Sequence, residues 1–254
     1  MFELKDNVVI NRGKESEPFA LSYKGEGSYA HVYTYHDDFY DRDFILKRAK
    51  KDLSEKELTR FKQEFDIMKQ LQSPYIVEVY CYNEAKKEYI MERMDYTLLQ
   101  YINSNIQKLN MNRKKSILKQ IYKAFNYIHK QGLLHQDINP NNILIKLYKD
   151  DTLVVKVADF GLVHVPDSLL TTLNTEWKGA FNDPVLKRLG FNQYAMPHEI
   201  YALTCVSAFV LTGKTNLTKI SDPHIQHFID IGVNSDESKR YKDVSEMKKC
   251  LNNL

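Results

Sequence analysis

The sequence predicts an α+β fold with two lobes, because strand-like and helix-like segments are separated along the chain rather than alternating. In the first third, short β-prone runs are divided by Gly or Asp clusters and interrupted by one helical pattern. After about Asp95, apolar residues recur at the three- and four-residue steps of helices. At 254 residues, 43% hydrophobic and 27% charged, the chain has the composition of one globular domain.

The strand-rich part is expected to contain five strands and one helix. Three β-prone runs, at 19–23, 31–35 and 43–47, precede the helix, and two more, at 76–82 and 88–93, follow it. The helix should begin at Ser54, because Glu57 three residues later completes a capping-box pattern ahead of the apolar positions Leu58, Phe61 and Phe65.

The helical part has one clear amphipathic helix, one buried helix and a short hairpin. An apolar stripe that Gly132 ends as a C-terminal cap predicts the first; it consists of Ile117, Ile121, Phe125 and Ile128. Strands at 143–145 and 153–158 flank a turn, and a loop-rich stretch follows to about Gln193. The run 199–211 is apolar almost all round, which indicates a buried helix, and Asp243 with Glu246 begins the last one.

Charge and cysteine content exclude several classes of protein. The formal net charge of +3, from 36 basic and 33 acidic residues, argues against a dedicated nucleic-acid binder, and the lysines are expected to form a solvated surface. Three separated cysteines, Cys81, Cys205 and Cys250, have no metal-ligand spacing and favour a reducing, cytoplasmic location. No run approaches the roughly 18 apolar residues of a membrane span, and the N-terminus does not read as a signal peptide, so no membrane partner is expected.

A glycine-containing segment, from Gly25 to Val32, lies between two predicted strands. Gly25 and Gly27 would let backbone N–H groups approach phosphate oxygens, and Val32 could cover a purine. A simple hairpin turn explains the same residues and is the commoner case. Because the segment joins strand to strand, it does not match the dinucleotide-binding pattern, which opens a helix.

Lys47 and Glu64 form a candidate pair. Lys47 ends an apolar strand, and Glu64 lies on the core-facing side of the following helix with Phe61 and Met68. A buried carboxylate needs a partner, and Lys47 could serve as one while also holding phosphates.

Three further candidate residues, Asp137, Asn142 and Asp159, lie in predicted loops. Asp137 and Asn142 lie five residues apart in a loop that suits a hydroxyl-orienting base and a metal ligand, although a polar turn rich in Asn and Pro explains the loop equally well. Asp159, followed by Phe160 and Gly161, ends the next strand, where its carboxylate could bind Mg²⁺.

The order of these motifs resembles that of the protein kinase family, and the resemblance covers about residues 19–251. It implies a bilobal protein-kinase-like fold with an N-lobe at 1–91, a hinge at 92–95 and a C-lobe at 96–254. It also implies a eukaryotic-like Ser/Thr protein kinase domain that uses ATP and Mg²⁺ on a protein substrate. Control by a regulatory partner protein, by its neighbours in the genome or by autophosphorylation is expected.

The resemblance assigns roles to single residues. Lys47 and Glu64 resemble the ion pair that grips the α- and β-phosphates, Asp137 the catalytic aspartate, and Asn142 and Asp159 the Mg²⁺ ligands. Met91 falls at the gatekeeper position, residues 92–94 at the hinge that reads adenine, and Val32 and Leu144 on the two faces of the base. The implied nucleotide-binding set is Gly25, Gly27, Val32, Ile45, Lys47, Met91, Glu92, Met94 and Leu144.

Several residues depart from the family pattern. Gln136 replaces the arginine before the catalytic aspartate, so control by phosphorylation at Thr171, Thr172 or Thr175 is not expected to follow the usual route. The glutamate that commonly pairs with the arginine at Arg240 is missing, since Asp183-Pro184-Val185 stands in its segment, and Glu199 replaces a buried aspartate.

Asn139 replaces the loop lysine that contacts the γ-phosphate. We hypothesise that Lys178, which takes the place of a facing threonine, supplies the missing cation and acts with Asn139 in catalysis. A solvated loop lysine is the alternative.

Two other functions stay open. A small-molecule phosphotransferase of the aminoglycoside- or choline-kinase type shares the His-x-Asp-x-x-x-x-Asn loop but usually carries a large insertion that this chain lacks. A pseudokinase acting as a binding module would be expected to lack Lys47, Asp137 or Asp159, and all three are present. Serine and threonine are favoured over tyrosine because the loop lacks the arginine that tyrosine kinases place near Asn139.

Overall fold

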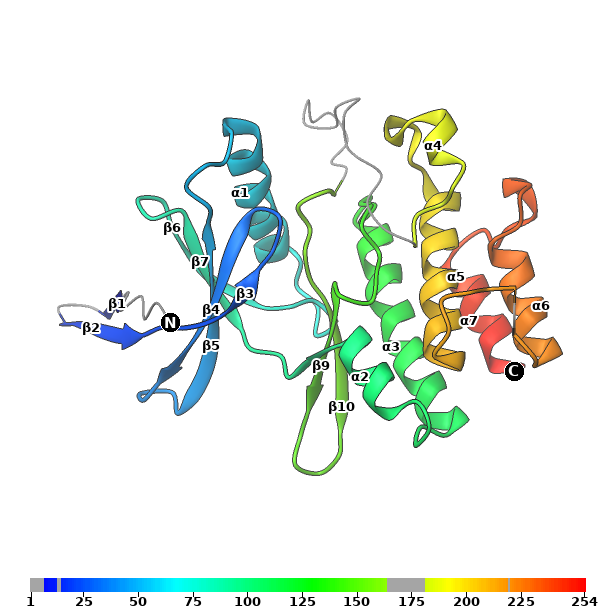
Figure 1. Ribbon diagram of the computed structural model, residues 1–254, viewed down its shortest axis with the longest axis horizontal. Coiled ribbons are helices and arrows are strands. Elements are labelled where there is room, and N and C mark those ends of the chain that lie inside the picture. Colours follow the sequence, from blue (N-terminus) through cyan, green and yellow to red (C-terminus); the bar gives the residue numbers. More distant parts are fainter. Residues whose placement is uncertain (1–6, 13–14, 164–180, 219) are drawn as a thin grey trace. The chain divides into compact units, whose positions relative to one another are not determined.

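The computed structural model describes residues 7–12, 15–163, 181–218 and 220–254, with side chains described from Phe19 onward. The chain divides into two compact units (Figure 1). The N-terminal unit comprises Met1–Gln70 and Val77–Arg93, and the C-terminal unit comprises Leu71–Ile76 and Met94–Leu254. Within the described residues, none of the helices combines the length and the apolar character needed to cross a membrane.

The N-terminal unit is built on a five-stranded antiparallel sheet with the strand order β3-β4-β5-β7-β6 and one helix, α1. A separate hairpin, β1–β2, precedes the sheet. The elements are β1 (Asn7–Arg12), β2 (Glu15–Ala20), β3 (Ser22–Glu26), β4 (Ala30–Asp37), β5 (Arg42–Ala49), α1 (Glu55–Gln70), β6 (Val79–Asn83) and β7 (Glu88–Glu92).

Aromatic side chains fill both faces of this sheet. On one face Tyr35 stacks on Phe44, with ring centroids 5.6 Å apart, in a buried cluster with Leu46. On the other face Phe61 and Phe65 of α1 pack against the ring of Tyr89, at 5.2 and 5.6 Å. Because strand side chains alternate between faces, Leu46 and its neighbour Lys47 on β5 lie on opposite faces, and Tyr89 of β7 pairs with Lys47. Helix α1 begins as predicted, since the Ser54 backbone N–H donates to Glu57 Oε2 at 2.8 Å.

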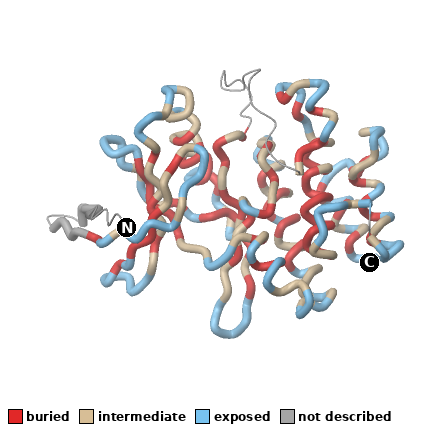
Figure 2. The backbone as a smooth tube through the Cα atoms, viewed as in Figure 1, coloured by how far each residue is buried: buried red, intermediate tan, exposed pale blue. Residues whose placement is uncertain are grey.

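The C-terminal unit is mainly helical. Its core contains α5, where nearly every residue from His198 to Leu211 is buried; Figure 2 shows this helix mostly in the colour of buried residues. The elements are β8 (Tyr96–Thr97), α2 (Leu98–Asn105), α3 (Met111–Lys130), β9 (Ile143–Leu147), β10 (Leu153–Val157), α4 (Leu186–Leu189), η1 (Phe191–Gln193), α5 (Met196–Thr212), α6 (Pro223–Gly232), η2 (Glu237–Lys239) and α7 (Val244–Asn252).

The α+β class is confirmed, and most predicted elements are present with shifted ends. The single strand expected at 19–23 is wrong: β2 ends at Ala20 and β3 begins at Ser22, so the chain passes from the hairpin to the sheet at Leu21. Continuous β-propensity hides this change of partner, because propensity does not identify the strand that a segment pairs with. The cap at Gly132 is as expected, with a left-handed φ of 75° after α3 ends at Lys130.

Candidate active site

The glycine-containing turn joins β3 to β4 in the N-terminal unit. The register shifts between Tyr23 and Gly25, and Gly25 has a φ of 150°, which a residue with a side chain rarely adopts. The Gly27 N–H donates to the Ala30 carbonyl at 2.8 Å, which closes the turn. A Cβ atom added at Gly25 or Gly27 would meet nothing within 4 Å, so the backbone here is open to a ligand.

Lys47 and Glu64 are paired as the sequence predicts. Antiparallel pairing places Lys47 on β5 between Val32 of β4 and Tyr89 of β7. Its Nζ atom donates to Glu64 Oε1 at 2.7 Å and lies 5.7 Å from the centre of the Tyr89 ring. The Lys47 side chain is 19% exposed and that of Glu64 is 6% exposed. The buried carboxylate therefore fixes an ammonium group that still reaches solvent.

Neighbouring strands carry three more predicted residues. Ile45 lies opposite Met91 across β5 and β7, and Met91 is buried. The Glu92 carboxylate accepts a hydrogen bond from the Glu78 N–H at 2.8 Å, and the Glu92 N–H donates to the Glu78 carbonyl at 3.0 Å. Glu92 therefore secures the end of β7 with its side chain and one backbone group.

In the C-terminal unit, the loop from His135 to Asn142 positions Asp137. The Asn139 Nδ2 atom donates to Asp137 Oδ1 at 3.0 Å, and the Asn142 Nδ2 atom donates to Asp137 Oδ2 at 2.9 Å. Asn142 also donates to the Asp137 carbonyl at 2.9 Å. Two amides on opposite carboxylate oxygens leave the side chain little rotational freedom, so Asp137 is held in one orientation.

His135 links this loop to the strand that precedes Asp159. Its Nδ1 atom accepts from the Asp137 N–H at 3.3 Å, and its Nε2 atom lies 3.0 Å from the Ala158 carbonyl. In this pattern Nδ1 accepts and Nε2 donates to the Ala158 carbonyl. The fully buried Phe160 packs on His135, with ring centroids 4.9 Å apart.

Asp159 is half-buried and has a left-handed φ of 64°. Because Asp is among the few residues with side chains that tolerate this region, the backbone can turn sharply as it leaves β10. Burial raises the pKa of Asp137, and the negative charge of Asp159 raises it further. The two carboxylates therefore lie close enough to interact, a like-charge arrangement that a cation would relieve.

Glu199 on α5 binds the loop that contains Asp137 through the Gln136 N–H. Sequence reasoning did not assign this role to it. Its carboxylate is fully buried and accepts hydrogen bonds from the His129 ring at 3.0 Å, the Gln136 N–H at 2.9 Å and the Tyr194 hydroxyl at 2.9 Å. Burial alone would raise the pKa of Glu199, but the interactions with His129, together with those of His135 and the Gln136 N–H, outweigh it, and the pKa is lowered. The signals in the sequence were an acidic residue at the start of an apolar helix and its place at a position where the family has a buried aspartate.

Arg240 is not left without a carboxylate, contrary to the expectation from the missing glutamate. Asp183 pairs with the Arg240 guanidinium, which also donates to the Asn234 carbonyl at 2.8 Å and the Pro197 carbonyl at 3.0 Å. The guanidinium lies 5.3 Å from the centre of the Tyr201 ring. Asp183, two positions before the place of the family's glutamate at Val185, thus takes over the pairing with Arg240.

The remaining predicted residues lie as follows. Leu144 is half-buried on β9 opposite Thr97 of β8, and Met94 is half-buried at the start of the second segment of the C-terminal unit. Lys178 and the candidate phosphorylation positions lie outside the described residues; these positions are Thr171, Thr172 and Thr175.

The predicted site residues form two sets, one in each unit. The N-terminal unit contains Gly25, Gly27, Val32, Ile45, Lys47, Glu64, Met91 and Glu92. The C-terminal unit contains Met94, Asp137, Asn139, Asn142, Leu144 and Asp159.

Comparison with known proteins gives the family. The model of the protein kinase domain matches residues 21–254. The chain is 26% identical over 200 residues, 75% of its length, to a probable serine/threonine-protein kinase of Arabidopsis thaliana, and 28% identical over 201 residues, 76% of its length, to cyclin-dependent kinase-like 4 of Mus musculus. It is 31% identical over 156 residues, 58% of its length, to NUAK family SNF1-like kinase 1 of Homo sapiens.

The matched segments span 34%, 56% and 23% of these three relatives, respectively. The family match, in contrast, covers nearly the whole chain, including both sets of site residues. The chain therefore belongs to the protein kinase domain family.

Proposed function

We propose that this chain is an active protein kinase that transfers the γ-phosphoryl group of Mg-ATP to a serine or threonine hydroxyl of a protein. The observation that carries the proposal is the Asp137 carboxylate, held by the amides of Asn139 and Asn142. A catalytic base must be oriented before it can act, and these two hydrogen bonds orient it in the free protein.

Asp137 has the properties of a hydroxyl-orienting base. Its pKa is raised, first by burial and then by Asp159, which makes the carboxylate a better proton acceptor than an exposed aspartate. The hydrogen bonds from Asn142 and Asn139 oppose this rise, because they stabilise the ionised form of the carboxylate. Asp137 would therefore accept the proton of the acceptor hydroxyl at one of its two oxygens.

Asn142 and Asp159 fit a Mg²⁺ ion by the chemistry of their donors. Asn142 directs its N–H groups at Asp137, so its Oδ1 atom is the group that remains for a metal. Asp159 supplies a half-buried carboxylate, and Mg²⁺ prefers such oxygen ligands. When bound, Mg-ATP supplies the phosphoryl group and neutralises part of its charge.

Lys47 is the proposed phosphate-binding cation of the N-terminal unit. Its ammonium group is fixed by Glu64 at 2.7 Å and keeps part of its surface exposed. The open backbone at Gly25 and Gly27 could approach phosphate oxygens without a steric penalty. Ile45, Val32, Met91 and the backbone of residues 92–94, with Leu144 of the C-terminal unit, would bind the base.

The acceptor class rests on two observations. The relatives of the chain include a probable serine/threonine-protein kinase, and the loop after Asp137 has Asn139 rather than an arginine. We also propose that a regulatory partner protein controls the chain. Neither nucleic acid nor a membrane surface is part of the proposed activity.

The test is phosphoryl transfer from labelled ATP to a degenerate peptide mixture, with aminoglycosides and choline as separate acceptors. The chain should label serine and threonine peptides, and Asp137→Asn should lower the rate by at least a hundredfold. Asp151→Asn is the matched control, because Asp151 is exposed in a turn with a φ of 62° that asparagine also tolerates. Transfer to the small molecules alone would assign the chain to the other phosphotransferases. No transfer to any acceptor, with ATP still bound, would indicate a binding module.

A further inference from the structure

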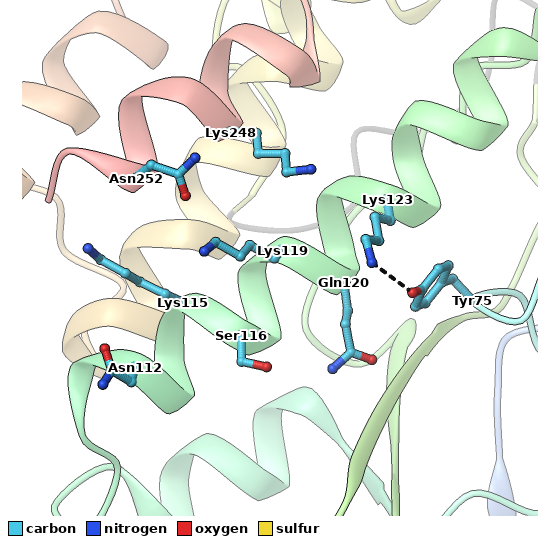
Figure 3. A pocket seen from close by; sticks show the side chains of 9 residues that line it. All are labelled: Tyr75, Asn112, Lys115, Ser116, Lys119, Gln120, Lys123, Lys248 and Asn252. Carbon is cyan, nitrogen blue, oxygen red and sulfur yellow. Dashed lines mark hydrogen bonds between the residues drawn. The ribbon is translucent and has the colours of Figure 1, made fainter.

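A pocket lined by basic and neutral polar side chains lies on the C-terminal unit, and none of its lining residues is among those proposed for catalysis. It has a volume of about 770 Å³ and is formed by one side of α3, the end of α7 and Tyr75 (Figure 3). Its lining residues are Tyr75, Asn112, Lys115, Ser116, Lys119, Gln120, Lys123, Lys248 and Asn252. They will be called the lysine pocket.

The helical repeat explains why α3 lines this pocket. Residues three, four and seven positions apart share one face of a helix, and Lys115, Lys119 and Lys123 follow this spacing. The opposite face of α3 is buried in the core through Ile117, Ile121 and other apolar residues. The lysines are therefore fixed to a helix that cannot rotate.

Four ammonium groups share the lysine pocket without a carboxylate. Lys115, Lys119 and Lys123 come from α3 and Lys248 comes from α7, and the described lining residues include neither aspartate nor glutamate. The whole chain has a formal charge of only +3. The pocket thus concentrates positive charge, while acidic residues elsewhere in the chain balance most of the total. A cluster of positive charges of this kind attracts anions.

The walls of the pocket are fixed by contacts to the neighbouring strand. Gln120 donates to the Leu153 carbonyl and accepts from the Val155 N–H, both at 3.0 Å. Lys123 donates to the Tyr75 hydroxyl at 3.2 Å and lies 5.5 Å from the centre of its ring. Part of the site is therefore preformed, which lowers the free-energy cost of ordering it around a ligand.

We propose that the lysine pocket binds a small anion that carries two or more phosphate groups. Its volume lies within the roughly 300–1,000 Å³ of ligand sites, but its lining suits a hydrophilic molecule rather than an apolar one. With a rise of about 1.5 Å per residue, Lys115 and Lys123 are spaced by about 12 Å along α3, so one phosphate cannot contact all the lysines. Ser116, Asn112 and Asn252 supply neutral hydrogen-bond donors beside them.

The binding test uses sodium tripolyphosphate without Mg²⁺ in isothermal titration calorimetry. The double variant Lys119→Gln/Lys248→Gln should bind at least tenfold more weakly than the unchanged chain. Lys130→Gln/Lys149→Gln is the control: it removes the same charge, Lys130 lies on the same helix, and both residues are exposed outside the pocket. Its affinity should change less than twofold.

Two further variants test whether binding occurs at the lysine pocket and depends on its charge. The same difference between the double variants should persist in a Lys47→Met background, which removes the proposed ATP-binding cation. Lys119→Arg/Lys248→Arg, which keeps the charge, should retain most of the affinity. The proposal is overturned if both glutamine doubles bind alike, or if Lys47→Met alone abolishes binding.

The source of the phosphate groups is distinguished by sedimentation with vesicles. Phosphatidylcholine vesicles that contain a phosphoinositide should pull down the chain, with release by tripolyphosphate, if a lipid headgroup is the ligand. Tripolyphosphate binding without vesicle binding indicates a soluble ligand. A doubly phosphorylated peptide that binds at least tenfold more tightly than tripolyphosphate, in a manner that depends on Lys119 and Lys248, would contradict the assignment to a small molecule.

Discussion

Asp183 and Arg240 form an ion pair in the C-terminal unit in which each side chain is only 3% exposed. The pair joins the segment before α4 to the residue that follows η2, 57 positions further along the chain. Asp183 also accepts a hydrogen bond from the Val185 N–H at 3.1 Å. The carboxylate thus connects the segment before α4 with the residues that follow η2.

Asp183→Ala should destabilise the C-terminal unit by about 3–5 kcal/mol, because it leaves a buried guanidinium without its charge partner. Chemical denaturation followed by far-UV circular dichroism measures this loss. The double variant Asp183→Leu/Arg240→Met should recover much of the stability, since it removes both charges. Equal stability of Asp183→Ala and the unchanged chain would show that the pair contributes nothing.

Glu199→Gln should destabilise the protein by about 1–3 kcal/mol at neutral pH, because glutamine cannot accept a hydrogen bond at both terminal atoms. The pKa of Glu199 in the folded protein is below its ordinary value of 4.5. Its charge therefore stabilises the fold above pH 4.5, and this contribution is lost as the pH falls through the lowered pKa. Thermal melts across that range should show a smaller acid-induced loss in the variant than in the unchanged chain.

The acid limb of the pH–rate profile should respond to Asn139. The hydrogen bond from Asn139 lowers the pKa of Asp137, against the larger upward effects of burial and of Asp159. Asn139→Ala removes this donor, so the pH at which kcat/KM falls to half should move upward. Asn141→Ala is the matched control, because only its backbone N–H contacts Asn139. If the acid limb of the kcat/KM profile does not shift in Asn139→Ala, the ionisation of Asp137 does not determine it.

Lys47→Met should abolish phosphoryl transfer and should lower stability only slightly, since the Lys47 side chain is partly exposed. It also removes the ion-pair partner of a Glu64 side chain that is 6% exposed. Adding Glu64→Gln should therefore restore the lost stability without restoring activity. Near-native turnover by Lys47→Met would show that this lysine has been assigned the wrong role.

Lys178→Ala tests the hypothesis that this lysine compensates for Asn139. Turnover should fall more than tenfold with little change in ATP affinity, because the missing cation would act on charge that develops during transfer. Asn139→Lys in the same background should recover part of the rate. A normal turnover by Lys178→Ala would contradict the hypothesis.

Local patterns allowed the sequence to predict some of these features and not others. The Ser54–Glu57 cap depends on residues three positions apart. The Lys47–Glu64 pair was inferred from an apolar strand pattern and a helix face, although β5 continues past Lys47 to Ala49. The partner of Arg240 could not be predicted, because the residues around Asp183 show no helical or strand periodicity from which the position of its side chain could be inferred. The β1–β2 hairpin was missed for a related reason, since its strands carry no regular alternation of apolar and polar residues.

The hydrogen bond from Gln136 to Glu199 has a consequence for how the loop around Asp137 can open. The Gln136 amide proton is covered by a carboxylate on α5, the most continuously buried helix among the described ones. That proton can exchange with solvent only when Glu199 withdraws, which requires the first turn of α5 to separate from the loop. Its exchange rate is then tied to the opening of the helical core rather than to a local fluctuation of the loop.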